Sequence, residues 1–78
     1  MLTSDQLRAG RALIRWSAED LSEKSGVGLS TIRRMEAADG VPSASARNLA
    51  EVQRALEAAG VEFIAENGGG PGVRLKKG

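Results

Sequence analysis

The stretch from Leu21 to Glu36, LSEKSGVGLSTIRRME, constrains the fold of this 78-residue chain more than any other. Its apolar residues recur at helical spacing on both sides of Gly26, which predicts two short amphipathic helices joined by a tight turn. Glycine has no Cβ, so it is the usual residue at the left-handed position that closes a helix. Val27 follows, and we expect its side chain to fill the corner between the helices.

The second predicted helix has two unlike faces. Ile32 and Met35 lie three residues apart, so they share the inward face, with Glu36 beside them. The side chains predicted to point outward are mostly small, hydroxyl-bearing or cationic: Leu29, Ser30, Arg33, Arg34 and Ala37. Such a row suits base edges and phosphates, although an ordinary solvated face is the alternative for its two arginines. The helix begins at Gly28, where free N–H groups and the helix dipole favour an anion.

In residue type and spacing, this stretch resembles the helix-turn-helix domain of the Cro and phage-repressor type, the XRE family. The matching positions are a small residue on the first motif helix, the turn glycine, the hydrophobe after it and two later hydrophobes: Ser22, Gly26, Val27, Ile32 and Met35. The family also pairs an arginine of its first helix with a glutamate that closes the recognition helix, and Arg11 and Glu36 hold those positions. The resemblance covers residues 4 to 58. It departs at Ala18, where the family often has a glutamine that touches DNA.

The resemblance implies a mainly α fold: a compact, lambda-repressor-like helix-turn-helix bundle of four to five helices, which we assign to residues 1–60. Residues 61–78 lie beyond the resemblance, and their own pattern predicts a short β-strand tail, as a C-terminal β-hairpin or as dimer-forming strands. It implies a sequence-specific regulator of transcription, a repressor, whose recognition helix at residues 28–38 enters the major groove of double-stranded DNA. Base contacts are expected from Leu29, Ser30 and Arg34. Contacts to the DNA backbone are expected from Ser17, Gly28, Thr31, Arg33 and Arg47. Arg11 and Glu36 are expected to form a structural pair, with unrelated solvated charges as the alternative.

Capping residues predict the remaining helices. Thr3 and Gln6 form a capping-box pattern for a first helix that runs to about Arg15. The residues expected on its core side are Leu7, Leu13 and Ile14, with Trp16 anchoring the junction as a core side chain. Ser17 and Asp20 form a weaker box for the next helix. Pro42 and Ser43 open a long helix that ends at Gly60, with an apolar stripe of Leu49, Val52 and Leu56.

Two short β-rich runs, VEFI and VRL, follow Gly60 and flank the turn NGGGPG. Charged residues alternate there with apolar ones, which predicts two antiparallel strands. Because an isolated two-stranded hairpin is marginal in water, the strands must either lie on the helices or pair with a second copy. We favour the second copy, in a homodimer whose recognition helices lie about 34 Å apart. The dimerisation candidates are Val61, Phe63, Val73 and Leu75.

Composition limits the chemistry and the location of the chain. There is no cysteine, so the chain cannot form disulfides or thiolate metal sites. There is also no histidine, which is the commonest general base. We therefore expect that the protein is not an enzyme and that it binds no metal or cofactor. No apolar run approaches the roughly 20 residues of a membrane span, and the N-terminus lacks a signal-peptide pattern, so we expect a cytoplasmic protein. The net charge is only +1, with cations on the predicted recognition helix and glutamates late in the chain. We therefore expect one positive face and one acidic face.

A second function class stays open at this point. The same fold could serve as a protein-interaction module, such as an antitoxin-like binder that holds a partner protein through the strands or an acidic helix face. The salt dependence of binding distinguishes the two functions. The affinity for DNA falls steeply as the salt concentration rises, whereas the affinity of an apolar protein contact changes little.

Overall fold

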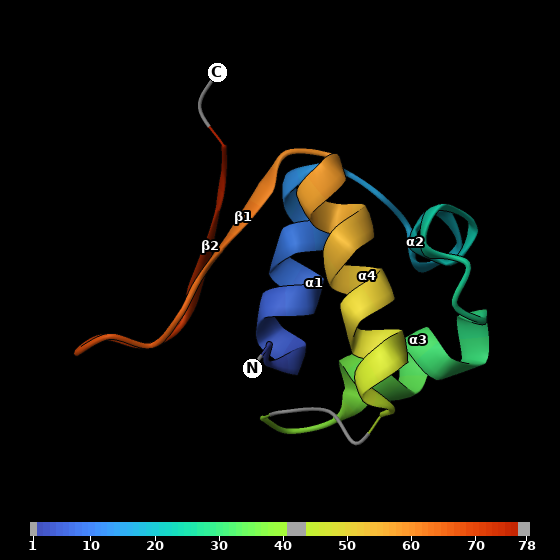
Figure 1. Ribbon diagram of the computed structural model, residues 1–78, viewed down its shortest axis with the longest axis horizontal. Helices are drawn as coiled ribbons and strands as arrows, with labels where there is room; N and C mark the ends of the chain where they lie inside the picture. Colours follow the sequence, from blue (N-terminus) through green and yellow to red (C-terminus); the bar gives the residue numbers. More distant parts are fainter. Residues whose placement is uncertain (1, 41–43, 77–78) are drawn as a thin grey trace.

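Four helices and one β-hairpin make up residues 2–40 and 44–76, the part of the chain that the computed structural model describes. In chain order these elements are α1 (Ser4–Leu13), α2 (Ala18–Ser25), α3 (Leu29–Ala37), α4 (Ala46–Ala58), β1 (Val61–Ile64) and β2 (Gly72–Leu75). In Figure 1, α1 and α4 lie at the centre, with the hairpin on one side of them and α2 and α3 on the other. The predicted mainly α fold is confirmed.

Reciprocal capping boxes start α1 and α2, as predicted. The Thr3 hydroxyl accepts from the Gln6 N–H at 3.1 Å, and the Gln6 side chain accepts from the Thr3 N–H at 2.9 Å. Ser17 and Asp20 repeat this exchange at 3.0 and 2.9 Å, and the hydrogen bond from the Ser17 N–H lowers the pKa of Asp20. The stabilisation from this ionised carboxylate is present above its ordinary pKa and is lost as the pH falls through the lowered one.

The end of α1 differs from the sequence prediction. The helix stops at Leu13, and Arg15 adopts the left-handed conformation with φ of 58°, so the helix does not reach Arg15. Leu13 was expected on the core side but is 38% exposed. It lies six residues after the buried Leu7, which places it about 120° around the helix from the core face. Ile14 and Trp16 are half-buried and pack against the core.

The start of α4 also needs a correction. The described helix begins at Ala46, and its N-cap is Ser45, whose hydroxyl accepts from the Asn48 N–H at 3.1 Å. The predicted start at Pro42 and Ser43 lies outside the described residues. The helix ends at Ala58, just before Gly60, and its predicted apolar stripe is buried.

The two strands pair with each other inside one chain and lie on α1, so the structure has the arrangement that the sequence analysis did not favour. They are antiparallel, with Val61 opposite Leu75 and Phe63 opposite Val73. Gln6 fastens the hairpin to α1 because its amide donates to the carbonyls of Ile64 and Gly72, at 3.1 and 3.0 Å. On the opposite face of the hairpin, Arg74 and Glu62 form an exposed ion pair at 2.6 Å.

Gly10 allows the hairpin to lie closely against α1. A Cβ at this position would be 3.2 Å from Val61 Cγ1 and 3.4 Å from the Phe63 ring. The hairpin therefore adds Val61 to the core that the helices form. The buried hydrophobic side chains of that core are Leu2, Leu7, Leu21, Val27, Ile32, Met35, Leu49, Val52, Leu56 and Val61. Within the described part of the chain, no helix combines the length and the apolar character needed to cross a membrane.

Gly10→Leu is expected to displace the hairpin and to lower the free energy of unfolding by about 1–3 kcal/mol, because the larger side chain overfills a close contact. Urea denaturation measures this loss. The matched control is Gly69→Leu, since an added Cβ at Gly69 meets no atom within 4 Å. Equal effects of the two substitutions would contradict the close packing of the hairpin on α1.

Candidate nucleic-acid interface

The turn between α2 and α3 is fixed by three of the predicted residues. Gly26 has φ of 76°, and its N–H donates to the Ser22 carbonyl at 3.0 Å. The Ser22 hydroxyl donates to the Val27 carbonyl at 2.7 Å, and the Val27 side chain is buried. Because the turn is tied back to α2 in this way, the start of α3 has a defined position.

The side chains of α3 divide into an inward and an outward set. Ile32, Met35 and Glu36 are buried. Ser30, Arg33 and Arg34 are exposed, and the Arg34 guanidinium donates to the Thr31 hydroxyl at 3.3 Å. Leu29 was expected to be exposed at the tip of the helix but is half-buried, as is Thr31. An apolar side chain at the first turn gains free energy by leaving water, which accounts for the difference.

The first turn of α3 is open to an anion. Gly28 is the N-cap and makes no side-chain capping hydrogen bond, and the first turn carries no acidic residue. The partial positive charge of the helix N-terminus is therefore not offset by a carboxylate from the helix itself. This end of α3 can donate backbone N–H groups to a phosphate or to a polar base edge.

The last turn of α3 is held by side chains from one face of α1. The Ser4 hydroxyl donates to the Met35 carbonyl at 2.6 Å, and Arg8 donates to the Glu36 carbonyl at 2.7 Å. Together with Arg11, these residues are spaced four and then three apart, so they line one side of the helix. Ser4 and Arg8 were not predicted from the sequence, because their partners are backbone carbonyls that lie far away along the chain. The spacing was the one signal available.

Arg11 and Glu36 are brought together as a bidentate pair. The Arg11 Nε and Nη2 atoms donate to the two Glu36 oxygens, each at 2.8 Å, and Nη1 donates to the Trp16 carbonyl at 2.9 Å. The side chains are only 23% and 10% exposed, and the hydrogen bond to Glu36 raises the pKa of Arg11. The pair links α1, the α1–α2 junction and the end of α3. Its geometry therefore positions α3 and does not contact a ligand.

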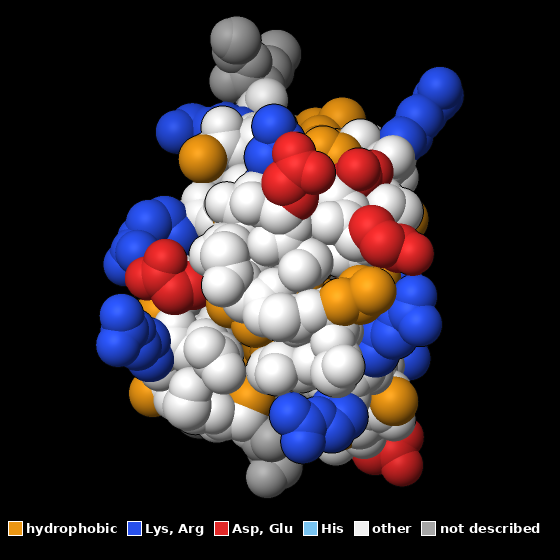
Figure 2. Space-filling view, turned by 90° about the vertical axis from the view of Figure 1, so that its right-hand side faces the viewer, with side chains coloured by type: hydrophobic (Ala, Val, Ile, Leu, Met, Phe, Trp, Pro, Cys, Tyr) orange, Lys and Arg blue, Asp and Glu red, His pale blue; other side chains and the backbone are white. Residues whose placement is uncertain are grey.

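The face that α2 and α3 present carries charges of both signs. Figure 2 shows Lys and Arg side chains interspersed with Asp and Glu on this side of the molecule. Arg33 of α3 forms an ion pair with Glu19 of α2 at 3.3 Å. The face expected to be positive therefore also carries a carboxylate, that of Glu19. Glu19 and Asp20 occupy the first turn of α2, where the helix dipole favours carboxylates, and this brings negative charge beside α3.

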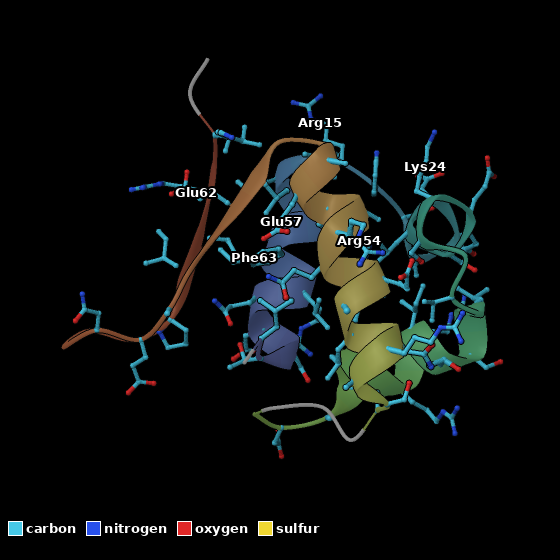
Figure 3. The ribbon with its side chains drawn as sticks, viewed as in Figure 1. Arg15, Lys24, Arg54, Glu57, Glu62 and Phe63 are labelled. Carbon is cyan, nitrogen blue, oxygen red and sulfur yellow. The ribbon has the colours of Figure 1, made fainter. Side chains whose placement is uncertain are left out.

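The other predicted contact residues lie outside α3. Ser17 is exposed at the start of α2, and its hydroxyl accepts from the Asp20 N–H while remaining able to donate. Arg47 is exposed on the first turn of α4, and no hydrogen bond or ion pair within the described residues joins it to α3. Arg15 and Lys24 point outward at the end of the molecule away from α3 (Figure 3).

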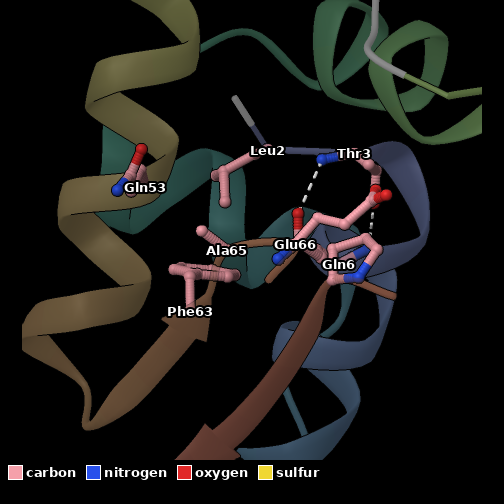
Figure 4. Close-up of a pocket in the computed structure, with 8 residues that line it drawn as sticks. Leu2, Thr3, Gln6, Gln53, Phe63, Ala65 and Glu66 are labelled. Atoms are coloured by element: carbon pink, nitrogen blue, oxygen red, sulfur yellow. Dashed lines mark hydrogen bonds between the residues drawn. The ribbon is translucent and has the colours of Figure 1, made fainter. Parts of the chain in front are cut away.

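The dimerisation candidates differ in accessibility. Val61 is buried, Phe63 and Val73 are half-buried against the core, and Leu75 is 52% exposed. Phe63 also lines a cavity of about 580 Å³ between the start of α1, α4 and the hairpin, together with Leu2 and Gln53 (Figure 4). Within residues 2–40 and 44–76, no group of three or more histidine, cysteine, aspartate or glutamate side chains is placed to hold a metal ion.

Comparison with protein-family models gives no match for this chain, and comparison with curated proteins gives none either.

Proposed function

We propose that this chain is a sequence-specific regulator that binds double-stranded DNA through a helix-turn-helix of the lambda-repressor-like type, with α3 as the recognition helix. The observation that carries the proposal is the two-faced α3, positioned at one end by the Gly26 turn and at the other by α1. An exposed helix with cationic and hydroxyl side chains, presented by a rigid support, has the size and chemistry to enter the major groove.

The proposed contacts fall into two groups. In this proposal Ser30 and Arg34 contact base edges, with two hydrogen bonds from Arg34 to a guanine, and Leu29 supplies an apolar contact near a thymine methyl group. The residues proposed to contact the sugar-phosphate backbone are Ser17, Gly28, Thr31, Arg33 and Arg47. Backbone contacts set the position of the protein on DNA, and base contacts set its sequence preference. On this proposal the chain acts in the cytoplasm, as a repressor that covers its site.

The test is selection from a random pool of duplex DNA, followed by fluorescence anisotropy of the selected duplex and a scrambled duplex at several salt concentrations. The proposal predicts binding of the selected duplex at least about a thousandfold tighter than the scrambled one, with affinity that falls steeply as salt rises. Weak binding without sequence preference would contradict it and would favour a protein-interaction module.

We also propose that the chain binds its DNA site as a two-fold homodimer. A two-stranded hairpin has two outer edges, each of which is a template for pairing with another strand, and the neighbouring Leu75 is 52% exposed. A symmetric dimer matches a pseudo-palindromic site with half-sites about 34 Å apart.

Leu75→Glu is expected to convert the dimer into a monomer at micromolar concentration, because a carboxylate in an apolar contact is unfavourable. Sedimentation velocity measures the change. Ala50→Glu, an exposed position on α4, adds the same charge and is expected to leave the dimer intact. A monomeric wild-type chain under these conditions would contradict the dimer.

A further inference from the structure

Glu19 is the acidic residue of α2 that meets a cation of the proposed recognition helix. Its carboxylate lies 3.3 Å from the Arg33 guanidinium, and the two side chains are 63% and 62% exposed. Asp20, the next residue, is instead engaged in the capping box with Ser17. Glu23 lies one turn further along α2 and is exposed, and no ion pair is formed by it among the described residues. The position of Glu19 is therefore specific, not a general consequence of an acidic helix.

We propose that Glu19 attenuates DNA binding by holding the Arg33 guanidinium and by repelling the phosphate that would replace it. This inference rests on the proposed function of the α3 face. A guanidinium held by Glu19 has fewer N–H donors left for a phosphate, and the Glu19 carboxylate lies close to any phosphate that Arg33 binds. Both effects lower the affinity for DNA.

The attenuation acts on one kind of contact. Arg33 is proposed to contact the DNA backbone, which is the same for every sequence, whereas Arg34 is proposed to contact bases. Glu19 therefore reduces binding to all duplexes by a similar factor. Because both affinities change together, the preference for the correct site over unrelated DNA stays the same.

The experiment replaces Glu19 by Gln, which removes the charge and nearly preserves the shape. Anisotropy with the scrambled duplex is expected to show about three- to tenfold tighter binding at 50 mM salt, and a salt dependence steeper by about one released counterion. The selected duplex is expected to tighten by the same factor, so that the ratio between the two duplexes stays unchanged. Thermal unfolding followed by circular dichroism checks that the variant folds.

Two comparisons distinguish the loss of the Glu19–Arg33 ion pair from the mere loss of one negative charge. Glu23→Gln removes the same charge from the same helix without opening an ion pair, and it is expected to tighten binding less than Glu19→Gln. In an Arg33→Ala background, Glu19→Gln is expected to lose most of its effect. Equal tightening by the two glutamine variants, an undiminished effect without Arg33, or no binding by Glu19→Gln at 50 mM salt would overturn the proposal. If the wild-type chain binds the selected and the scrambled duplexes equally, the proposed function itself fails, which is a different outcome from the failure of the Glu19 proposal.

Discussion

Arg34→Ala is expected to weaken binding to the selected duplex by about 5- to 150-fold, equivalent to about 1–3 kcal/mol, and to relax the preference at one base pair. The Arg34 side chain is exposed on α3, and its guanidinium donates to the Thr31 hydroxyl one turn earlier. That contact draws the guanidinium back toward the preceding turn of the helix, and it opens when the side chain extends to a base. The extended guanidinium matches the two acceptors that guanine offers in the major groove.

Binding to a panel of duplexes with single base-pair changes measures this effect. Arg33→Ala is the matched control because it removes the same side chain from the neighbouring position. It is expected to weaken binding to every duplex by a similar factor and to reduce the salt slope by about one. If Arg34→Ala instead weakens all duplexes equally, Arg34 contacts the backbone and the proposed division of roles on α3 fails.

Arg11→Met is expected to lower the free energy of unfolding by about 2–4 kcal/mol, because it leaves the Glu36 carboxylate buried without its partner. The Glu36 side chain is 10% exposed and accepts two hydrogen bonds from Arg11. Urea denaturation gives the size of the loss. Since Glu36 lies in the last turn of α3, the variant is also expected to weaken DNA binding without removing a DNA contact.

Arg54→Met is the control, because it measures the effect of replacing an arginine by methionine in an exposed ion pair. Arg54 pairs with Glu51 on the surface of α4, where the side chains are 69% and 38% exposed, so the substitution is expected to cost less than about 1 kcal/mol. The double variant Arg11→Met/Glu36→Leu is expected to regain part of the stability that Arg11→Met loses, since it removes the unpaired charge. Similar losses for Arg11→Met and Arg54→Met would show that the Arg11–Glu36 pair contributes little.

Features with a local signal were predicted well from the sequence. The capping boxes at Thr3 and Ser17 and the turn at Gly26 depend on residue types at short, fixed spacings, and the structure has all three. The inward face of α3 followed from helical periodicity. The pairing of Arg11 with Glu36 has no local signal and came from the family resemblance alone.

Contacts between distant residues were not predictable in this way. Ser4 and Arg8 bond backbone carbonyls of α3, and a carbonyl leaves no mark in the sequence because every residue has one. Glu19 was not singled out from the sequence, since only the packing of α2 against α3 places it beside Arg33. The role of Gly10 was not predicted, because this glycine lies inside a helix and not at a turn. It lets the hairpin approach the middle of α1 closely.

The central claim, that the α3 face binds duplex DNA, is tested most directly by nuclear magnetic resonance of the isotope-labelled chain titrated with the selected duplex. We expect the largest amide shifts in residues 28–34 and at the start of α2, and small shifts in the part of β1 and β2 farthest from α3. The largest shifts on the hairpin, with α3 unchanged, would contradict the claim.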